Sequence, residues 1–246
     1  MRVKMSLRTT NRRISWNRRR RRGQELLEFG LLLTVLVPLL LGTFVTGLSL
    51  VRSIQTNQMD RDLTDMYIHG ADFSTYAMQQ IAQRLGRGLN LQIGSSFSNS
   101  QYLNTGNGGD GLVTVSKIMW VGTTAQPNCS SVGAANCTNH DKFVFTQRIQ
   151  FGNGTLTSQT PSSLGDPGAG AVITSGGYVQ NYVTDSNAAV PGAAQTNLQN
   201  LWQVNSAGRT PLADGRVVYV VETYIQNLNL GLNLYSTGGI YARYFF

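Results

Sequence analysis

An uncharged run of 23 residues, from Phe29 to Val51, constrains this chain more than any other feature. It is rich in leucine and valine, and the charged residues Glu28 and Arg52 bound it. An α-helix rises about 1.5 Å per residue, so this run is long enough to cross the roughly 30 Å hydrocarbon core of a bilayer. The sequence therefore predicts a single-pass transmembrane helix over residues 24–52.

The basic residues are concentrated before this run. Ten of the 20 lysine and arginine residues precede Gly23, where there is no acidic residue. The pI near 9.8 is thus a property of the first residues and is poor evidence for a nucleic-acid-binding domain. Positive charge marks the cytoplasmic side, so residues 1–23 are predicted to be a basic cytoplasmic leader, with the rest of the chain across the membrane. The topology signal is carried by Arg18, Arg19, Arg20, Arg21 and Arg22.

A removable secretory signal is the competing interpretation of the N-terminus. No alanine precedes Ala71, so an A-x-A cleavage site is missing, although Gly47-Leu48-Ser49 offers a weak substitute. The apolar run is also longer than the usual signal core of about 7–15 residues. These features favour an anchor that stays in the membrane.

Beyond Arg52 the apolar and small residues, which are typical of buried positions, recur periodically. Apolar and small side chains recur at steps of three and four, as in a helix with one buried face. The pattern predicts an amphipathic extension of the same helix over residues 53–87, with a bend at Gly70. The positions that carry the pattern are Met59, Leu63, Met66, Tyr67, Gly70, Ser74, Ala77, Ile81 and Leu85.

Residues 88–246 are predicted to form a β-rich extracytoplasmic domain. Within it lies a stretch rich in Gly, Ser and Asn, at about 152–214, which is interpreted as an insertion with one short helix over 193–204. The fold class is therefore α+β, with the long N-terminal helix packed on an antiparallel sheet of about four strands. The four predicted strands are 112–121, 142–151, 215–227 and 240–246.

The second of these strands carries the clearest alternation in the chain. Four of its odd positions are large and apolar, and its even positions include polar side chains, which predicts a sheet with one buried and one wet face. The predicted buried set is Phe143, Phe145, Ile149 and Phe151, and the alternating set is Val144, Thr146, Arg148 and Gln150.

The two cysteines, Cys129 and Cys137, lie in one polar loop on the side predicted to be oxidising. That compartment favours a disulfide between them over two free thiols. His140 follows closely, but two cysteines and one histidine lack the fourth ligand of a structural zinc site. No metal site is predicted.

Motifs of catalysis are missing from the sequence. It contains no Walker loop, no H-E-x-x-H and no G-x-S-x-G, and its two histidines, His69 and His140, are far apart. We therefore expect no enzymatic activity, no catalytic residues, no cofactor and no small-molecule substrate. Nucleic acid is not expected as a partner either.

At the junction between leader and apolar run, a basic leader ends at Gly23, Gln24 follows, and Glu28 is the fifth residue counted from Gln24. This combination resembles the class III, or prepilin-type, signal of type IV pilins and pseudopilins. Within that superfamily the run GQELLEFGLLLTVLVPLLLGTF, followed by a sizeable β-rich tail, is similar to TadE-like proteins of tight-adherence (Flp-type) pilus systems. The resemblance covers residues 18 to about 87.

This resemblance implies a pilin-like fold and a structural role. A prepilin peptidase would cut between Gly23 and Gln24, and Glu28 would recruit the subunit into the assembly. The implied function is that of a minor pilin or pseudopilin of a tight-adherence pilus or secretion apparatus, held in the bacterial inner membrane with its C-terminal domain periplasmic or extracellular. Its partners would be the prepilin peptidase, other pilin or pseudopilin subunits and the assembly platform.

Two other functions fit the same sequence. One is a pseudopilin of a type II secretion system, which would share Gly23, Gln24 and Glu28 but serve other partners. The other is a signal-anchored extracytoplasmic binding domain whose leader is never cut. In that case Glu28 would be an interfacial residue held by Arg21, Arg22 or lipid headgroups at helical spacing.

Overall fold

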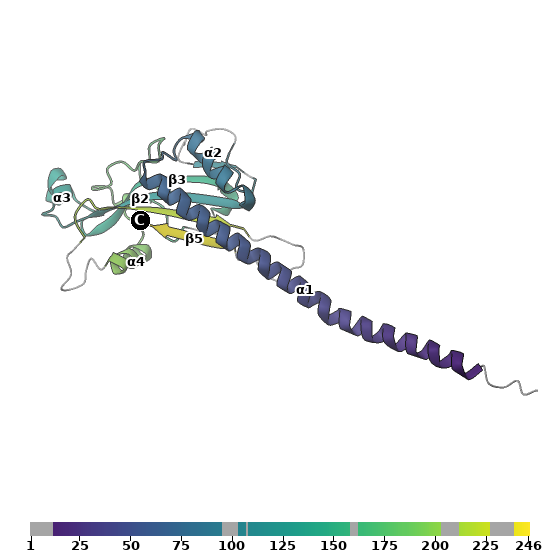
Figure 1. The fold of residues 1–246 in the computed structure, drawn as a ribbon. Helices are drawn as coiled ribbons and strands as arrows, with labels where there is room; N and C mark the ends of the chain where they lie inside the picture. Colours follow the sequence, from purple (N-terminus) through teal and green to yellow (C-terminus); the bar gives the residue numbers. More distant parts are fainter. Residues whose placement is uncertain (1–11, 95–102, 107, 158–161, 203–211, 227–238) are drawn as a thin grey trace, which may run out of the picture. The chain divides into compact units, whose positions relative to one another are not determined.

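The computed structural model describes residues 12–94, 103–106, 108–157, 162–202, 212–226 and 239–246, and for residues 12–22 it describes the backbone alone. The chain forms two compact units, Met1–Val51 and Arg52–Phe246. Its class is α+β, with a long apolar helix at the N-terminus and a mixed sheet of five strands (Figure 1).

Helix α1, Arg12–Ile68, supplies the first unit with its residues up to Val51 and the second unit with the rest. Its segment from Gly23 onward is long and apolar enough to cross a membrane, and none of its most apolar window is buried in the protein. The hydroxyls of Thr34, Thr43 and Thr46 donate to backbone carbonyls of the same helix at 2.7–2.9 Å. These polar groups are thus satisfied without water, as an apolar surrounding requires.

The amphipathic segment is two helices and not the single one predicted over residues 53–87. Helix α1 ends at Ile68, and Gly70 then adopts a φ of +90°, which a residue with a side chain rarely tolerates. The Asp72 carboxylate accepts hydrogen bonds from the backbone N–H and the hydroxyl of Ser74, and this turn leads into α2, Tyr76–Leu85. A 3₁₀ turn, η1, follows at Arg87–Leu89.

The sheet has the strand order β1-β3-β2-β4-β5. Its strands are antiparallel to their neighbours except β1, which runs parallel to β3 and makes the sheet mixed. The prediction of about four antiparallel strands missed β1 because LNTG has no apolar alternation. The strands are β1 Leu103–Gly106, β2 Gly111–Val121, β3 Lys142–Asn153, β4 Val217–Ile225 and β5 Ile240–Phe245.

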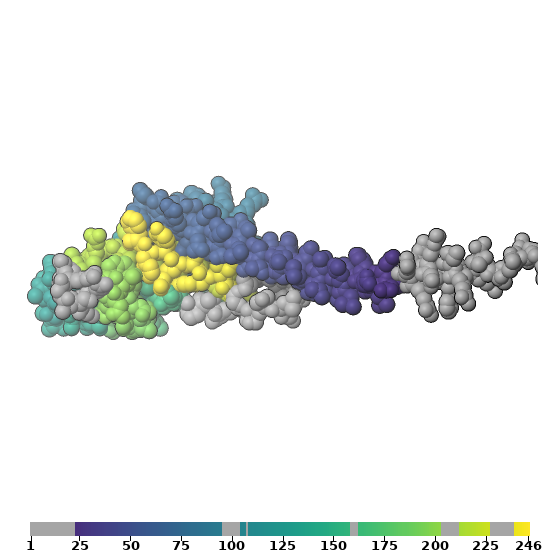
Figure 2. Space-filling view, turned by 60° about the horizontal axis from the view of Figure 1, so that its bottom comes forward, coloured from purple at the N-terminus to yellow at the C-terminus, as the bar shows by residue number. Residues whose placement is uncertain are grey.

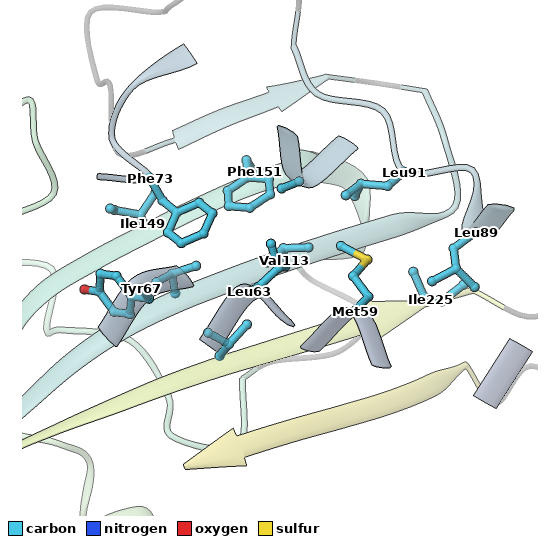
Figure 3. Close-up of a cluster of buried hydrophobic side chains, with 13 residues drawn as sticks. Met59, Leu63, Tyr67, Phe73, Leu89, Leu91, Val113, Ile149, Phe151 and Ile225 are labelled. Atoms are coloured by element: carbon cyan, nitrogen blue, oxygen red, sulfur yellow. The ribbon is translucent and has the colours of Figure 1, made fainter. Parts of the chain in front are cut away.

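One face of the sheet carries the outer part of α1. Met59, Leu63 and Tyr67 recur every four residues on this helix, and all three are buried against β2, β3 and β4 (Figure 3). Burying side chains of this size stabilises a fold by roughly 1.5–3 kcal/mol each. The Tyr67 hydroxyl also donates to Oε1 of Gln147 at 2.8 Å, so its polar end is satisfied inside the core.

A β-bulge divides the apolar positions of β3 between the two faces. Lys117 pairs with Gln147, but the next residue, Ile118, pairs with Phe145, so Thr146 is an extra residue in the ladder. One extra residue reverses the direction of every side chain beyond it. As a result, Ile149 and Phe151 face α1, whereas Phe143 and Phe145 belong to the core on the opposite face.

The prediction that one face of β3 is exposed to solvent is therefore wrong. Both faces of the strand are covered, and even the charged side chain of Arg148 is only 2% exposed. The second cover comes from the segment interpreted as an insertion, whose backbone follows β3 through hydrogen bonds that include Val179 N to Thr146 O (3.0 Å) and Val190 N to Phe143 O (3.0 Å). Its core side chains are Leu164, Val179, Ala188, Val190, Ala194 and Leu198.

This covering segment contains little regular structure. Its helix α4, Gly192–Trp202, matches the helix predicted at 193–204, of which residues 203 and 204 lie outside the described part of the chain. Short 3₁₀ turns lie at Gly154–Leu156 (η3) and Ser186–Ala188 (η4). The segment thus completes the core of the domain and is not an independent appendage.

Cys129 and Cys137 are joined in a disulfide that closes a loop with a sequence separation of 8. The loop contains α3, Pro127–Val132, and η2, Ala134–Asn136, and both sulfur-bearing residues are buried against the far end of the sheet. The Asp214 carboxylate holds the loop by accepting hydrogen bonds from the N–H groups of Gly122 and Asn128, both 2.8 Å. A cross-link of a loop this short stabilises a domain by about 2–3 kcal/mol.

Candidate functional site

The predicted processing and assembly residues lie together on α1. Gly23 is inside the helix, and a Cβ added to it would meet nothing within 4 Å. Gln24 and Glu28 are one helical turn apart, and the side-chain amide Nε2 of Gln24 donates to Oε1 of Glu28 at 3.4 Å. The helix therefore places the glutamate within reach of the residue that follows the glycine.

The charges around this turn are not neutralised within the described residues. Neither Glu25 nor Glu28 forms an ion pair there, and both side chains are exposed. The side chains of the topology signal, Arg18 to Arg22, fall outside the described side chains, so their predicted role stays a prediction. The backbone that carries them is helical.

The same helix presents an apolar surface that is exposed in the described part of the chain. The large apolar side chains that α1 contributes to the first unit are between 38% and 73% exposed. The apolar residues of the same helix after Thr56 include several that are buried. An exposed apolar area of this extent indicates a membrane or a partner helix as its normal surrounding. The exposed residues are Leu26, Leu27, Phe29, Leu31, Leu32, Val35, Leu36, Val37, Leu39, Leu40, Leu41, Phe44, Leu50 and Val51.

A buried polar cluster in the domain is the second candidate, and the sequence pattern gave no sign of it beyond the charge of Arg148 on a strand. The guanidinium of Arg148 donates to Asp166 Oδ1 at 2.7 Å, approaches Glu222 Oε2 at 3.4 Å and bonds the hydroxyl of Ser116. Arg148 comes from β3, Glu222 from β4 and Ser116 from β2, so the cluster lies across the centre of the sheet.

The buried carboxylate of this cluster is kept ionised by its neighbours. Burial alone would raise the pKa of Glu222, but the Arg148 charge and hydrogen bonds from Ser162, Tyr241 and Ser163 outweigh it and hold the pKa below its usual value. The space beside these residues is only about 10 Å³, room for about one water molecule. The cluster therefore joins the covering segment to the sheet, and the described residues leave no volume for a ligand there.

A third polar group is buried under α1. Asp60 is 1% exposed, its Oδ1 accepts a hydrogen bond from the Thr223 hydroxyl at 2.7 Å, and its Oδ2 has no partner among the described residues. Burial raises the pKa of Asp60 from 3.8 to about 7; the Thr223 hydrogen bond opposes this and the nearby Glu222 charge adds to it. The contact between α1 and the sheet thus contains a carboxyl that titrates near neutral pH.

This carboxyl predicts an unusual dependence of stability on pH. Because the pKa of Asp60 is raised in the folded state, its contribution is greatest below about pH 4 and falls as the pH rises to about 7. We expect the free energy of unfolding to drop by about 3 kcal/mol between about pH 5 and pH 8, and Asp60→Asn to remove most of this slope. Asp62→Asn, an exposed carboxylate on the same helix, should leave the slope unchanged.

Urea denaturation of the full chain in detergent at several pH values measures this slope directly. The carboxylates with lowered pKa, Glu222 and Asp214, lose their contribution only at more acidic pH, so they do not act in the same window. A slope that is equal in wild type and Asp60→Asn would show that Asp60 is not the titrating group.

The remaining candidate groups are dispersed. Within the described ranges, no three His, Cys, Asp or Glu side chains are placed to hold a metal ion. His69, in the turn directly after α1, lies beside the exposed Asp65, and His140 lies beside Asp141 in a surface turn. Comparison of the chain with protein-family models, with curated proteins and with solved structures gives no match.

Proposed function

We propose that the protein is a minor pilin or pseudopilin, a structural subunit of a tight-adherence pilus or secretion apparatus. The observation that carries this proposal is the arrangement at the start of the apolar helix, where Gln24 reaches Glu28 directly after Gly23. The exposed apolar helix and the α+β domain are compatible with such a subunit.

Cleavage after Gly23 would give this arrangement its function. The cut would convert the amide nitrogen of Gln24 into a free, positively charged amine one turn from Glu28. A carboxylate in an apolar surrounding is tolerated when it is paired, and the new amine of the same or a neighbouring subunit supplies the partner. Such a pair would favour subunits at one axial stagger, which is how a charge at the membrane edge becomes an assembly signal.

The domain suits a location outside the cytoplasm. Its disulfide requires an oxidising compartment for formation, and the basic leader before Gly23 is the part expected to stay in the cytoplasm. In this proposal the apolar helix anchors the subunit in the inner membrane of a bacterium and contacts other subunits. The prepilin peptidase and the assembly platform would be its further partners.

One observation favours the second candidate, a signal-anchored binding domain that is never cut. The bond after Gly23 lies inside α1, and a peptidase needs an extended substrate, so the helix must open there first. Glycine lowers the cost of opening, because it is about 1 kcal/mol less favourable in a helix than alanine. Whether the bond is cut therefore distinguishes the two functions.

The test is the N-terminus of the mature protein in the membrane fraction. We expect mass spectrometry to find a chain that begins at Gln24 and to find the uncut chain accumulating in the Gly23→Val variant. Gly30→Val is the matched control, since a Cβ at either glycine meets nothing within 4 Å, and it should be processed normally. A wild-type membrane form that begins at Met1 or near Leu50 would contradict the proposal.

A further inference from the structure

Strand β5 is an edge of the sheet that no other described strand covers. It pairs with β4 on one side and ends the strand order β1-β3-β2-β4-β5. Phe246 and Tyr219 exchange both backbone hydrogen bonds, at 2.9 and 3.0 Å. In an antiparallel ladder this pair shows which residues of β5 direct their backbone groups toward β4, because such residues alternate along the strand. The backbone groups of Tyr241, Arg243 and Phe245 therefore point away from β4, and among the described residues they have no backbone partner.

A pocket opens beside this edge, between β5 and α4. Its volume is about 140 Å³, and its lining is mainly apolar: Leu164, Ala194, Leu198, Leu201 and Phe245, with Arg243 at its border. Small-molecule sites are usually larger, about 300–1,000 Å³, whereas a cavity of about 150 Å³ accommodates one benzene-sized group. The volume of the pocket therefore matches a single apolar side chain. Figure 2 shows β5, in yellow, at the surface of the molecule.

The border of this pocket carries an unbalanced positive charge. Arg243 is exposed, its guanidinium lies 4.5 Å from the ring centre of Phe245 and donates to the Ser163 hydroxyl, and no carboxylate of the described residues forms an ion pair with it. All 12 acidic residues of the chain are among those described. Glu222, the residue opposite Arg243 on β4, is buried and already interacts with Arg148 and with three hydroxyl groups.

We propose that the β5 edge binds an extended peptide of a partner protein, which adds a strand to the sheet. The outward backbone groups of Tyr241, Arg243 and Phe245 would supply main-chain hydrogen bonds, and the pocket would take one apolar side chain of the peptide. Side chains two residues apart in a strand point to the same face, so an acidic residue two positions from the apolar one reaches Arg243. The recognised chemistry is thus an extended segment with an apolar and an acidic residue in alternate positions.

This binding site goes beyond the proposed function and does not depend on it. Every residue that forms it belongs to the unit Arg52–Phe246, whereas the pilin proposal rests on Gly23, Gln24 and Glu28. If the peptide does not bind, the proposal of cleavage after Gly23 is unaffected. If the chain is not cleaved, the β5 edge and its pocket are unaffected. The two proposals can therefore fail separately.

The probe is a fluorescent peptide of about eight residues, the length of one strand, in which leucine and valine alternate with glutamate and threonine. We expect a saturable rise in fluorescence anisotropy with the full chain in detergent. Arg243→Gln and Leu201→Asp should each weaken binding about ten-fold or more, because the first removes the cation and the second places a charge at the apolar pocket. Leu201 is already 58% exposed, so this change does not disturb the core.

Matched controls lie on α2, which packs on the opposite face of the sheet. Arg84→Gln and Leu85→Asp make the same changes at exposed positions and should leave binding unchanged. A peptide with lysine in place of glutamate should bind about ten-fold more weakly or not at all. No binding of the acidic peptide, or equal binding by all variants, would overturn the proposal. A concentration-dependent dimer lost in Leu201→Asp would identify a second copy of this chain as the occupant and overturn it as well.

Discussion

Replacing Arg148 with methionine is expected to lower the free energy of unfolding of the domain by about 3–5 kcal/mol. The side chain is 2% exposed, and its removal leaves Glu222, itself 3% exposed, as a buried carboxylate without a cation. A domain of this kind has a total stability of about 5–15 kcal/mol, so the variant should lose a large share of it and unfold at a clearly lower urea concentration than wild type.

Urea denaturation followed by tryptophan fluorescence measures this loss, since Trp120 is buried in the same core. Arg216→Met is the matched control, because Arg216 is exposed, and it should change stability by less than about 0.5 kcal/mol. The double variant Arg148→Met with Glu222→Gln should recover part of the loss by removing the unpaired charge. Equal stability of wild type and Arg148→Met would mean that the charges contribute nothing to the fold.

Replacing Glu28 with leucine is expected to abolish assembly while leaving the subunit in the membrane. The substitution removes a charge that costs roughly 2.5–3.5 kcal/mol at a bilayer centre, so insertion should be equal or better. Cleavage should persist because Gly23 and the basic leader are unchanged. The amount of subunit recovered with the pilus or secretion complex should fall about ten-fold or more, because the amine at Gln24 loses its partner.

Glu25→Leu is the control for this experiment. Glu25 is also exposed on α1, but Gln24 does not bond it in the structure, so its replacement should have a small effect on assembly. Membrane level, N-terminal processing and co-purification with pilus components are measured for both variants. Normal assembly of Glu28→Leu would refute the pairing role and support the alternative in which the glutamate is only an interfacial residue.

The sequence alone was sufficient for features encoded by neighbouring residues. The apolar run from Phe29 to Val51 is one long helix, and the four predicted strands appear within two residues of their expected limits. These features depend on local periodicity and on length, which a single chain segment displays by itself. The processing residues Gly23, Gln24 and Glu28 were singled out by the resemblance to prepilin-type signals, and their roles remain proposals.

The faces of the sheet were decided only by the tertiary structure. The bulge at Thr146 depends on how β3 pairs with β2, and no local pattern in β3 shows that Phe145 and Ile149 point to opposite faces. For the same reason Arg148 was expected in water and is buried, since its partners Glu222 and Asp166 come from distant parts of the sequence.

The end of α1 and the edges of the sheet also follow from long-range contacts. A three- and four-residue period continues through Gly70, but the packing of α2 on the sheet requires the chain to turn there, which a glycine with positive φ permits. Strand β1 has almost no sequence signal and exists because β3 offers it a parallel edge. The sequence by itself determined which segments are apolar and roughly where four of the strands lie; the tertiary structure decided where α1 ends, that β1 forms and which face each side chain occupies, because these depend on partners far away in the chain.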